Sequence, residues 1–375
     1  GLVDGFPIDF SSSAFSQRLK TLDHKLFLLM FMECSNALQA SLSTLRPGVR
    51  ELAPFASNIL ALDETCLDKL VRKTKLFKGL TKHEFARLSG RLAVLINIES
   101  GFIADVGYAP DADSNEKTRS RAMIKDVSAG SLLVFDLGYF SFPFFDYLTD
   151  HFLYYVSRLR GRTSTQTIAT LVDHEMYRES IVWLGKQRYI TNMLDSSQLP
   201  AANVWRLYKM RWKIERAFNT LKTILRTSYL RSTHLNGMLI QIWSALTVYQ
   251  ILMSIRLELT QSQGWNEDDI SWLSLIRKVD WYTRQRRGES FLEWLGRRAQ
   301  EIPLLKSGRR EHSAKDLDEE LLKICESIGP GAPGEECNWP WKRKPRQGDP
   351  PAHRPPMGDV LIASQAYLNL KASAA

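Results

Sequence analysis

The stretch that decides the fold is Tyr208–Arg226, which reads YKMRWKIERAFNTLKTILR. Arranged as an α-helix, it gathers its apolar side chains on one side and leaves the other side to one carboxylate surrounded by cations. The polar side consists of Tyr208, Arg211, Glu215, Lys222 and Arg226. The pattern predicts an amphipathic helix that packs on a core and presents these five side chains together toward solvent or a ligand.

A solvated face in which Glu215 forms ion pairs with nearby cations is the ordinary explanation of such a stripe. Two further acids favour a chemical role. Asp63 and Asp136 end the apolar, strand-like runs Leu60–Leu62 and Leu132–Phe135, although Asp is depleted in strands. Each alone is explained equally well as a turn or cap residue. Together with Glu215, however, they can bind two hard divalent cations through oxygen ligands, as in-line phosphoryl transfer requires.

The composition is that of a folded, basic protein. The chain has 375 residues, 44% of them hydrophobic and 24% charged, which excludes the disordered, collagen-like and coiled-coil classes for the chain as a whole. A net charge of +9 makes a polyanion the first partner to consider. The cysteines show no C-x-x-C spacing, which argues against a zinc knuckle or a disulfide scaffold and favours a reducing compartment. The first residues hold no basic-then-apolar leader, so we expect a cytoplasmic protein.

One uncharged stretch raises the question of a membrane span. Residues 235–255 contain no charged side chain over 21 positions, about the length that crosses a bilayer. Asn236, Gln241 and Gln250 interrupt it, and no second segment or aromatic belt accompanies it. We therefore interpret it as a buried core helix and expect no membrane partner.

The rest of the chain up to the decisive helix alternates between helical and strand-like runs. The predicted elements are, in order, helices within 17–47, a hairpin of strands 92–98 and 102–108, a strand 131–135, a short helix 143–149, strands 152–158 and 189–193, and a helix 201–224. Antiparallel strands thus follow the first acid, and the second acid lies at the end of a later strand.

The last part of the chain differs in composition. Residues 329–358 hold 8 Pro and 5 Gly, more than a packed core tolerates, so we predict a disordered tail. Gly329, Gly331 and Gly334 have G-x-G-x-x-G spacing, but prolines lie inside the motif and no strand precedes it, so we expect no nucleotide cofactor. Residues 281–310 carry eight Lys or Arg against three acids, which fits either a second DNA-binding surface or a solvated helix face.

Four residues of the decisive helix have a spacing that resembles the Tyr-Arg-Glu-Lys signature of DDE transposases of the insertion-sequence-four type: Tyr208, Arg211, Glu215 and Lys222. Asp63 in LALDET resembles the first acid of that family, Asp136 in FDLGYF the second, and Glu215 the third. The separations of 73 and 79 residues between successive acids suit the family. The resemblance covers roughly residues 55–255.

The resemblance implies an α/β fold with an RNase H-like core: a mixed sheet flanked by helices, with a small β-rich insertion before the third catalytic acid. The expected domains are a helical N-terminal remnant over 1–54, the catalytic domain over 55–260 with its insertion at about 160–200, a basic helical region over 261–325, and a disordered tail over 326–375.

The resemblance also implies the roles of the site residues. Asp63, Asp136 and Glu215 would bind two Mg²⁺ ions, with Mn²⁺ as a substitute, and would carry catalysis. Four residues would contact DNA: Tyr208, Arg211, Lys222 and Arg226. The expected partner is DNA, both element ends and target, bound by a homodimer in the nucleoid of a bacterial cytoplasm. Trp183 in the insertion fits either a base-stacking residue or a core tryptophan.

The predicted function is therefore that of a transposase that cuts DNA at the ends of an insertion sequence and joins the 3′-hydroxyls to target DNA. Two alternatives stay open. One is a catalytically inactive or truncated DNA-binding protein derived from a transposase, which the short region before the first strand favours. The other is a nuclease of the same fold that hydrolyses DNA without joining strands.

Overall fold

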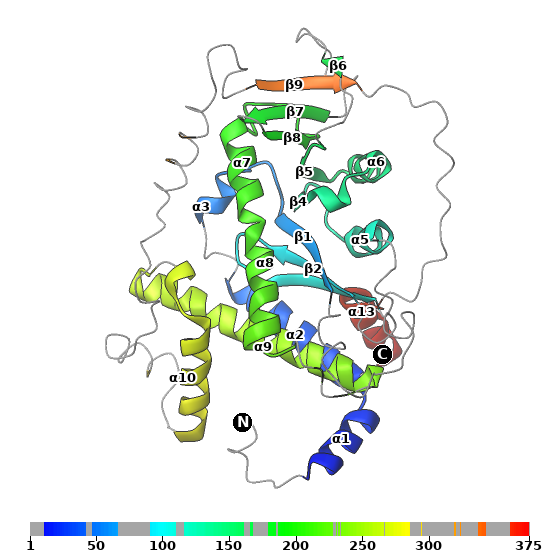
Figure 1. Ribbon diagram of the computed structural model, residues 1–375, viewed down its shortest axis with the longest axis vertical. Helices are drawn as coiled ribbons and strands as arrows, with labels where there is room; N and C mark the ends of the chain where they lie inside the picture. The colour runs from blue at the N-terminus through cyan, green and yellow to red at the C-terminus, as the bar shows by residue number, and fades with distance from the viewer. Residues whose placement is uncertain are drawn as a thin grey trace, which may run out of the picture.

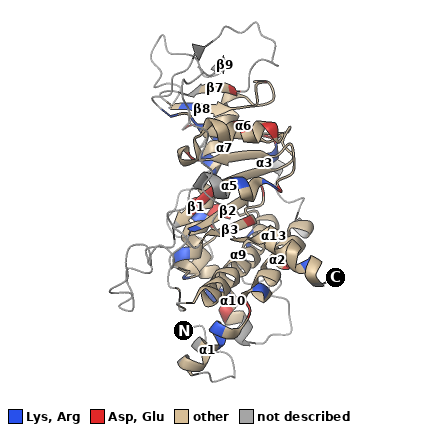
Figure 2. Ribbon diagram, turned by 90° about the vertical axis from the view of Figure 1, so that its right-hand side faces the viewer, with Lys and Arg blue, Asp and Glu red and all other residues tan. Residues whose placement is uncertain are grey.

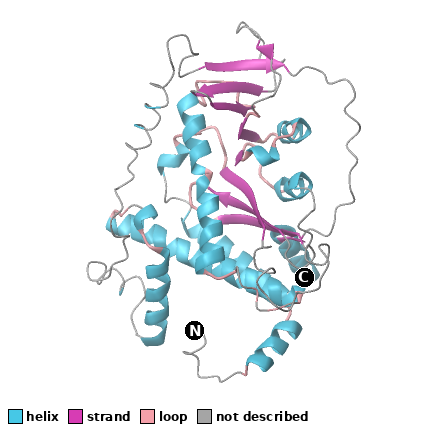
Figure 3. Ribbon diagram, in the orientation of Figure 1, coloured by secondary structure: helices cyan, strands magenta, loops and turns pink. Residues whose placement is uncertain are grey.

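The computed structural model shows a mixed α/β domain with helices on both faces of one sheet (Figures 1 and 3). The residues that the structure describes are 11–42, 47–66, 91–109, 116–160, 166–167, 179–184, 187–227, 230, 232, 234–265, 267–285, 294, 319, 323, 337–342 and 361–374.

Five strands form the part of the sheet that carries the acids: β1 (Ile59–Cys66), β2 (Arg91–Asn97), β3 (Ile103–Ala109), β4 (Leu132–Phe135) and β5 (Tyr154–Arg158). Their spatial order is β3-β2-β1-β4-β5. Strands β1, β4 and β5 are parallel, whereas β2 is antiparallel to both of its neighbours. This mixed sheet confirms the predicted RNase H-like fold and the predicted hairpin, which β2 and β3 form.

The sheet continues past β5 into the insertion that the sequence predicts before the third acid. Strands β8 (Gln187–Thr191) and β7 (Glu179–Leu184) form a hairpin that pairs with β5 through β8. The short β6 (Gln166–Thr167) lies at the end of the sheet. The insertion therefore extends the core sheet beyond the strand that follows Asp136.

Alternate residues of the central strands pack into two different cores, as the two-residue period of a strand requires. In β1, Ile59 and Ala61 face one cluster, and Leu60 and Leu62 face the other. The first cluster is covered by α2 (His24–Leu42), α7 (Ala201–Met210), α8 (Trp212–Asn219) and α9 (Leu235–Gln263). The second is covered by α5 (Glu116–Ile124) and α6 (Phe142–Asp150). A sheet buried on both faces explains the continuously apolar run of β4.

Helix α9 contains the uncharged stretch, and it lies in the core beside α2. It is long and apolar enough to cross a membrane, but most of its apolar window is buried inside the protein. The side chain of Gln250 is fully buried, and its amide bonds both the N–H and the carbonyl of Ile103 on β3, at 3.1 and 2.8 Å. The interpretation of this stretch as a buried core helix is confirmed.

Several short or peripheral helices complete the description. Helix α1 (Ser12–Thr21) and α3 (Pro47–Arg50) precede β1, the one-turn η3 (Leu137–Tyr139) follows β4, and η6 (Glu267–Asp269) and α10 (Trp272–Gln285) follow α9. In the part of the chain that the structure describes, basic and acidic residues lie along the molecule from α1 to β8 (Figure 2).

The tail departs from its prediction. Strand β9 (Cys337–Lys342) pairs with β7, β10 (Leu361–Ile362) pairs with β3, and α13 (Ala363–Ala374) packs on the first core. The prediction of a disordered tail over 326–375 is therefore wrong for these segments. A composition averaged over the tail hides short runs that can satisfy their backbone groups by pairing with strands already present. The glycine motif at 329–334 and most of the basic stretch 281–310 lie outside the described residues.

Candidate active site

Asp63 and Asp136 lie side by side on two neighbouring parallel strands. Asp136 directly follows β4, as the sequence predicts, but Asp63 does not end its strand, because β1 continues to Cys66 by pairing with β2. The register pairs Leu62 of β1 with Phe135 of β4, so the next residue along each chain is one of the two aspartates. Both side chains belong to the sheet face that α7 and α8 cover, because Ala61 and Val134, two residues earlier, point into that core. The sheet therefore brings together two acids that are 73 residues apart in the sequence.

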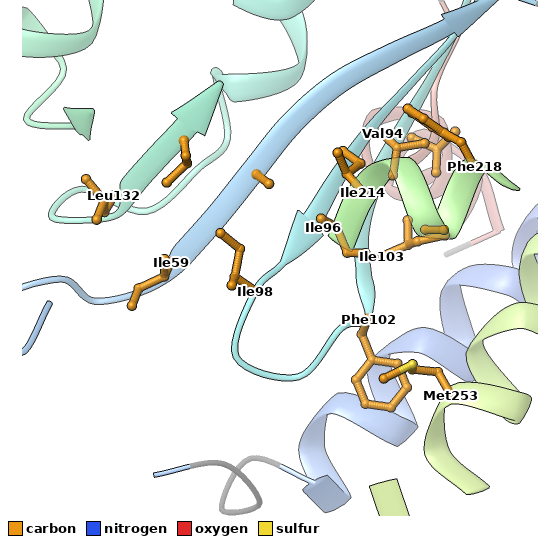
Figure 4. Close-up of a cluster of buried hydrophobic side chains, with 14 of the residues drawn as sticks. Ile59, Val94, Ile96, Ile98, Phe102, Ile103, Leu132, Ile214, Phe218 and Met253 are labelled. Atoms are coloured by element: carbon orange, nitrogen blue, oxygen red, sulfur yellow. The ribbon is translucent and has the colours of Figure 1, made fainter. Parts of the chain in front are cut away.

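Glu215 reaches the same place from α8. Ile214 and Phe218 of this helix are buried against β2, where Figure 4 shows them facing Val94 and Ile96. Anchoring α8 by these residues places Glu215, which directly follows Ile214, within 3.2 Å of the Arg211 guanidinium. The third acid is thus positioned by a helix that packs across the sheet, as its amphipathic pattern predicts.

One guanidinium group holds the three acids together. Arg211 Nη1 lies 3.1 Å from Asp63 Oδ2 and 3.2 Å from Glu215 Oε1, and Nη2 lies 4.0 Å from Asp136 Oδ1. The arginine side chain is 6% exposed. Its Nε is buried and has no hydrogen-bond acceptor among the described residues. Three negative charges therefore surround one positive charge, which leaves the cluster with excess negative charge.

Tyr208 also contacts the second aspartate, at the oxygen that faces Arg211. Its hydroxyl donates a 2.8 Å hydrogen bond to Asp136 Oδ1, and its ring packs edge-on against Tyr189 with the centroids 5.2 Å apart. Burial and the neighbouring Asp136 carboxylate raise the pKa of Tyr208, so the phenol remains a proton donor. The guanidinium of Arg211 lies over the same ring, at 5.5 Å from its centroid.

The two aspartates have different proton affinities. Burial raises the pKa of Asp63 to about 6, against the opposing effects of the Glu64 N–H and the Arg211 charge. For Asp136, burial also acts to raise the pKa, but hydrogen bonds from the Leu137 N–H and the Tyr208 hydroxyl outweigh it and lower the pKa overall. Asp63 therefore holds its proton to a higher pH than Asp136 does.

Lys222 lies next to this cluster and not on an open face. It belongs to a π-helical segment, Thr220–Ile224, that follows α8. Its Nζ donates a hydrogen bond to Thr65 Oγ1, two residues beyond Asp63 on β1. The wider turn of the π segment changes which side of the helix Lys222 occupies, as such segments often do at functional sites.

Two parts of the helical-wheel prediction need correction. Tyr208 and Arg211 are only 8% and 5% exposed, so the stripe faces the strand ends and not open solvent. Arg226 lies beyond the end of the π segment, is exposed, and has a left-handed backbone with φ of 55°. It does not share the stripe with Glu215, because the helix has ended two residues earlier.

The donor set fits hard divalent cations, but the ligands are not gathered in advance. Three carboxylates supply oxygen ligands, and their excess negative charge favours a doubly charged ion. Among the described residues no three acidic, histidine or cysteine side chains are close enough to hold a metal ion as they stand. The Arg211 guanidinium lies between them, so a metal would bind after this side chain has moved aside.

The sequence argument missed two residues at the edge of the site. Trp212, the first residue of α8, is 52% exposed, and the Arg211 guanidinium lies 5.8 Å from its ring centroid. Arg158, the last residue of β5, is exposed beside Asp136. A signal for Arg158 was available, because it ends the predicted strand 152–158, and the carboxyl ends of parallel strands meet at one edge. Trp183 lies on β7, and its side chain is outside the described residues.

The sequence of the chain is similar to that of one known protein family. A family described as transposase DDE domain matches residues 56–251, which is more than half of the chain. The chain belongs to this family. No curated protein matches this transposase. Among solved structures, it is similar to a piggyBac transposase in a synaptic complex with hairpin DNA, with a TM-score of 0.39 and 12% identity over 83% of this chain and 77% of that chain. The family match spans all three acids of the transposase.

Proposed function

We propose that this transposase is of the insertion-sequence-four type, cuts DNA at the ends of its element and joins the 3′-hydroxyls to target DNA. The observation that carries the proposal is the convergence of Asp63, Asp136 and Glu215 on one guanidinium, from two strands and a helix. Three acids brought together at the carboxyl edge of a sheet are hard to explain as solvated surface residues.

The carboxylates would be the ligands of two divalent cations, Mg²⁺ or Mn²⁺. Bound there, such ions activate the attacking oxygen and stabilise the leaving oxygen of an in-line displacement. The chain contributes position and charge: β1 and β4 hold the aspartates in register, α8 brings Glu215, and Tyr208 keeps one oxygen of Asp136 engaged. Arg211 and Lys222 would turn to phosphate oxygens once the acids have other partners.

DNA in the cytoplasm, as element ends and as target, would be the substrate, bound by a homodimer because two ends must be cut in concert. The alternative of an inactive DNA-binding derivative is disfavoured, because all three acids are present and adjacent. The alternative of a nuclease that does not join strands differs from a transposase in its products alone.

Nicking of supercoiled plasmid in Mn²⁺ tests the cleavage step without knowledge of the element's ends. We expect the purified chain to nick, and Asp63→Asn and Asp136→Asn to be inactive while they bind DNA at least as tightly, since a negative charge near phosphate is removed. Asp126→Asn is the matched control, because Asp126 is exposed on the far side of the sheet from the site and bonds Gln365. An Asp136→Asn variant that nicks at the normal rate would show that the site is assigned wrongly.

Joined products then separate the transposase from a nuclease. Incubation with a precleaved linear end and a plasmid target should give covalently joined DNA, and hydrolysis alone would support the nuclease. The mass of the protein–DNA complex, measured by light scattering, reports whether two chains assemble on the DNA.

A further inference from the structure

The two catalytic aspartates are part of a longer row across the sheet. The register pairs Val134 of β4 with Val156 of β5. Two residues further along, the same register places Arg158 opposite Asp136, just as Asp136 lies opposite Asp63. Neighbouring strands lie about 4.8 Å apart. Asp63, Asp136 and Arg158 thus occupy successive positions along the carboxyl edge of three parallel strands.

Arg158 lies on the same face of the sheet as the acids. Val156, two residues before it, packs into the core that α7 covers. On its other side Arg158 pairs with Tyr189 of β8, whose ring touches that of Tyr208. Burial raises the pKa of Tyr189 to about 12, and the charge of Arg158 opposes this rise, as it also does for Tyr208. Arg158 therefore lies between Asp136 on one neighbouring strand and Tyr189 on the other, and its charge acts on both.

Arg158 differs from the other cations of the site in the use of its donors. The donors of Arg211 are directed to the carboxylates, and the Lys222 ammonium bonds Thr65. The Arg158 side chain is exposed, and within the described part of the chain its guanidinium forms no hydrogen bond and no ion pair within 4 Å. An arginine has five N–H donors in a rigid fork that suits two oxygens of a phosphate.

We propose that Arg158 binds a phosphate of the DNA backbone, next to the phosphate that lies at the three carboxylates. The inference rests on the proposed function and names a contact that the Tyr-Arg-Glu-Lys signature does not contain. A strand that passes over Asp63 and Asp136 along the row meets Arg158 at the following position. DNA carries one phosphate per about 3.4 Å of axis on each strand, so a further phosphate is within reach of a side chain of this length.

The competing explanation is that Arg158 is only a counter-ion for Asp136. The two explanations differ in their effect on DNA binding. A phosphate contact releases a bound cation from DNA, so its loss lowers the slope of log K against log salt by about 0.9. A counter-ion within the protein leaves that slope unchanged.

The experiment is fluorescence anisotropy of a labelled short duplex DNA in Ca²⁺, titrated with the full chain between about 50 and 200 mM salt. We expect Arg158→Gln to lower the slope by about 0.9 and to weaken binding severalfold at the lowest salt, and Arg158→Lys to restore the slope. Arg121→Gln is the matched control. Arg121 lies on α5, behind the sheet, where it bonds the Pro143 carbonyl and stacks on Tyr147, so its loss should leave the slope as in the wild type.

The slopes of the two variants and the nicking assay together decide between the explanations. A slope for Arg158→Gln equal to that of the wild type overturns this inference, and so does an equal fall in Arg121→Gln. If either of these slopes is found but the wild type still nicks plasmid, the proposed function remains supported. Wild-type protein that neither binds DNA nor nicks it overturns the proposed function, and this inference with it. Equal melting temperatures of the wild type and Arg158→Gln, expected for an exposed residue, show that a changed slope is not a folding defect.

Discussion

The hydroxyl of Tyr208 donates a hydrogen bond of 2.8 Å to Asp136 Oδ1, and this bond joins α7 to the end of β4. Tyr208→Phe removes the donor and leaves the ring. We expect the pKa of Asp136 to rise, because hydrogen bonds to the charged carboxylate help to lower it. The free energy of unfolding at neutral pH should fall by about 1 kcal/mol or less, since Asp136 is half exposed.

The sign of the pH dependence follows from the lowered pKa. A carboxyl group whose pKa is depressed by folding contributes stability that is present at neutral pH and is lost as the pH falls through its folded value. The stability difference between wild type and Tyr208→Phe should therefore shrink on acidification. Urea unfolding at several pH values measures it, and a difference that stays constant would show that the bond does not act on the charge of Asp136.

Arg211→Gln should remove the positive charge that Asp63, Asp136 and Glu215 share. Removing the one cation that contacts all of them leaves neighbouring carboxylates unneutralised, and breaking a buried ion pair costs about 3–5 kcal/mol. We expect a smaller loss of stability here, since Glu215 and Asp136 are partly exposed. Mn²⁺ should then raise the melting temperature of the variant more than that of the wild type, because the metal no longer competes with a guanidinium.

Calorimetry with and without Mn²⁺ checks this prediction. Arg216→Gln is a suitable control, because Arg216 lies on the same helix and pairs with Asp268 away from the site. If Mn²⁺ shifts both variants and the wild type equally, Arg211 and the metal do not share the acids.

Lys222→Ala tests the second cation of the signature. Its ammonium lies beside the row of acids, bonded to Thr65, and a phosphate arriving there would give it a charged partner. We expect the salt dependence of DNA binding to lose about one counterion. Lys209→Ala should change it less, because the Lys209 ammonium lies over the Trp205 ring. An unchanged slope in Lys222→Ala would mean that the lysine only supports β1.

Asp105→Asn concerns the edge of the sheet and not the site. Asp105 on β3 accepts bonds from the N–H and hydroxyl of Ser364, at 3.0 and 2.5 Å, and so caps α13. Burial raises its pKa to about 6, although Ser364 and the Val106 N–H oppose the rise. A carboxyl group whose pKa is raised by folding contributes stability that is present below its unfolded value and is lost as the pH rises through about 6.

The wild type should therefore lose stability relative to Asp105→Asn as the pH is raised from about 4 to 7, because the amide does not ionise. Chemical unfolding of both proteins across this range measures the difference. Parallel stability curves would show that the pKa of Asp105 is not raised in the folded protein.

The sequence predicted the three acids and the decisive helix because their signals are local. Asp63 and Asp136 end apolar runs, and the apolar side of α8 is visible in its periodicity. The structure interrupts the predicted helix 201–224 at Arg211, between α7 and α8, and again in the π turn at Lys222, and neither interruption has a periodic signal in the sequence. A helical wheel assumes one continuous α-helix. It therefore placed Arg226 on the same face as Glu215, although the helix ends at Ile224.

The larger error is the prediction of a disordered tail, and long-range strand pairing explains it. Nothing near Leu361 indicates that it will lie opposite Tyr108, more than 250 residues earlier. A strand of two residues has almost no pattern of its own. At the site, the sequence marks Arg158 as the end of a strand, but the register of β4 and β5 is needed to show that it lies beside Asp136.

The position of β10 has a consequence for how the protein is made. Strand β3 is translated early, but the strand and helix that cover its outer edge, β10 and α13, come from residues 361–374. Until those residues leave the ribosome, β3 presents unpaired backbone groups that can pair with another chain. Pairs this distant in sequence also form slowly. Nascent chains would therefore be prone to associate through β3 until β10 and α13 have emerged and covered this edge of the sheet.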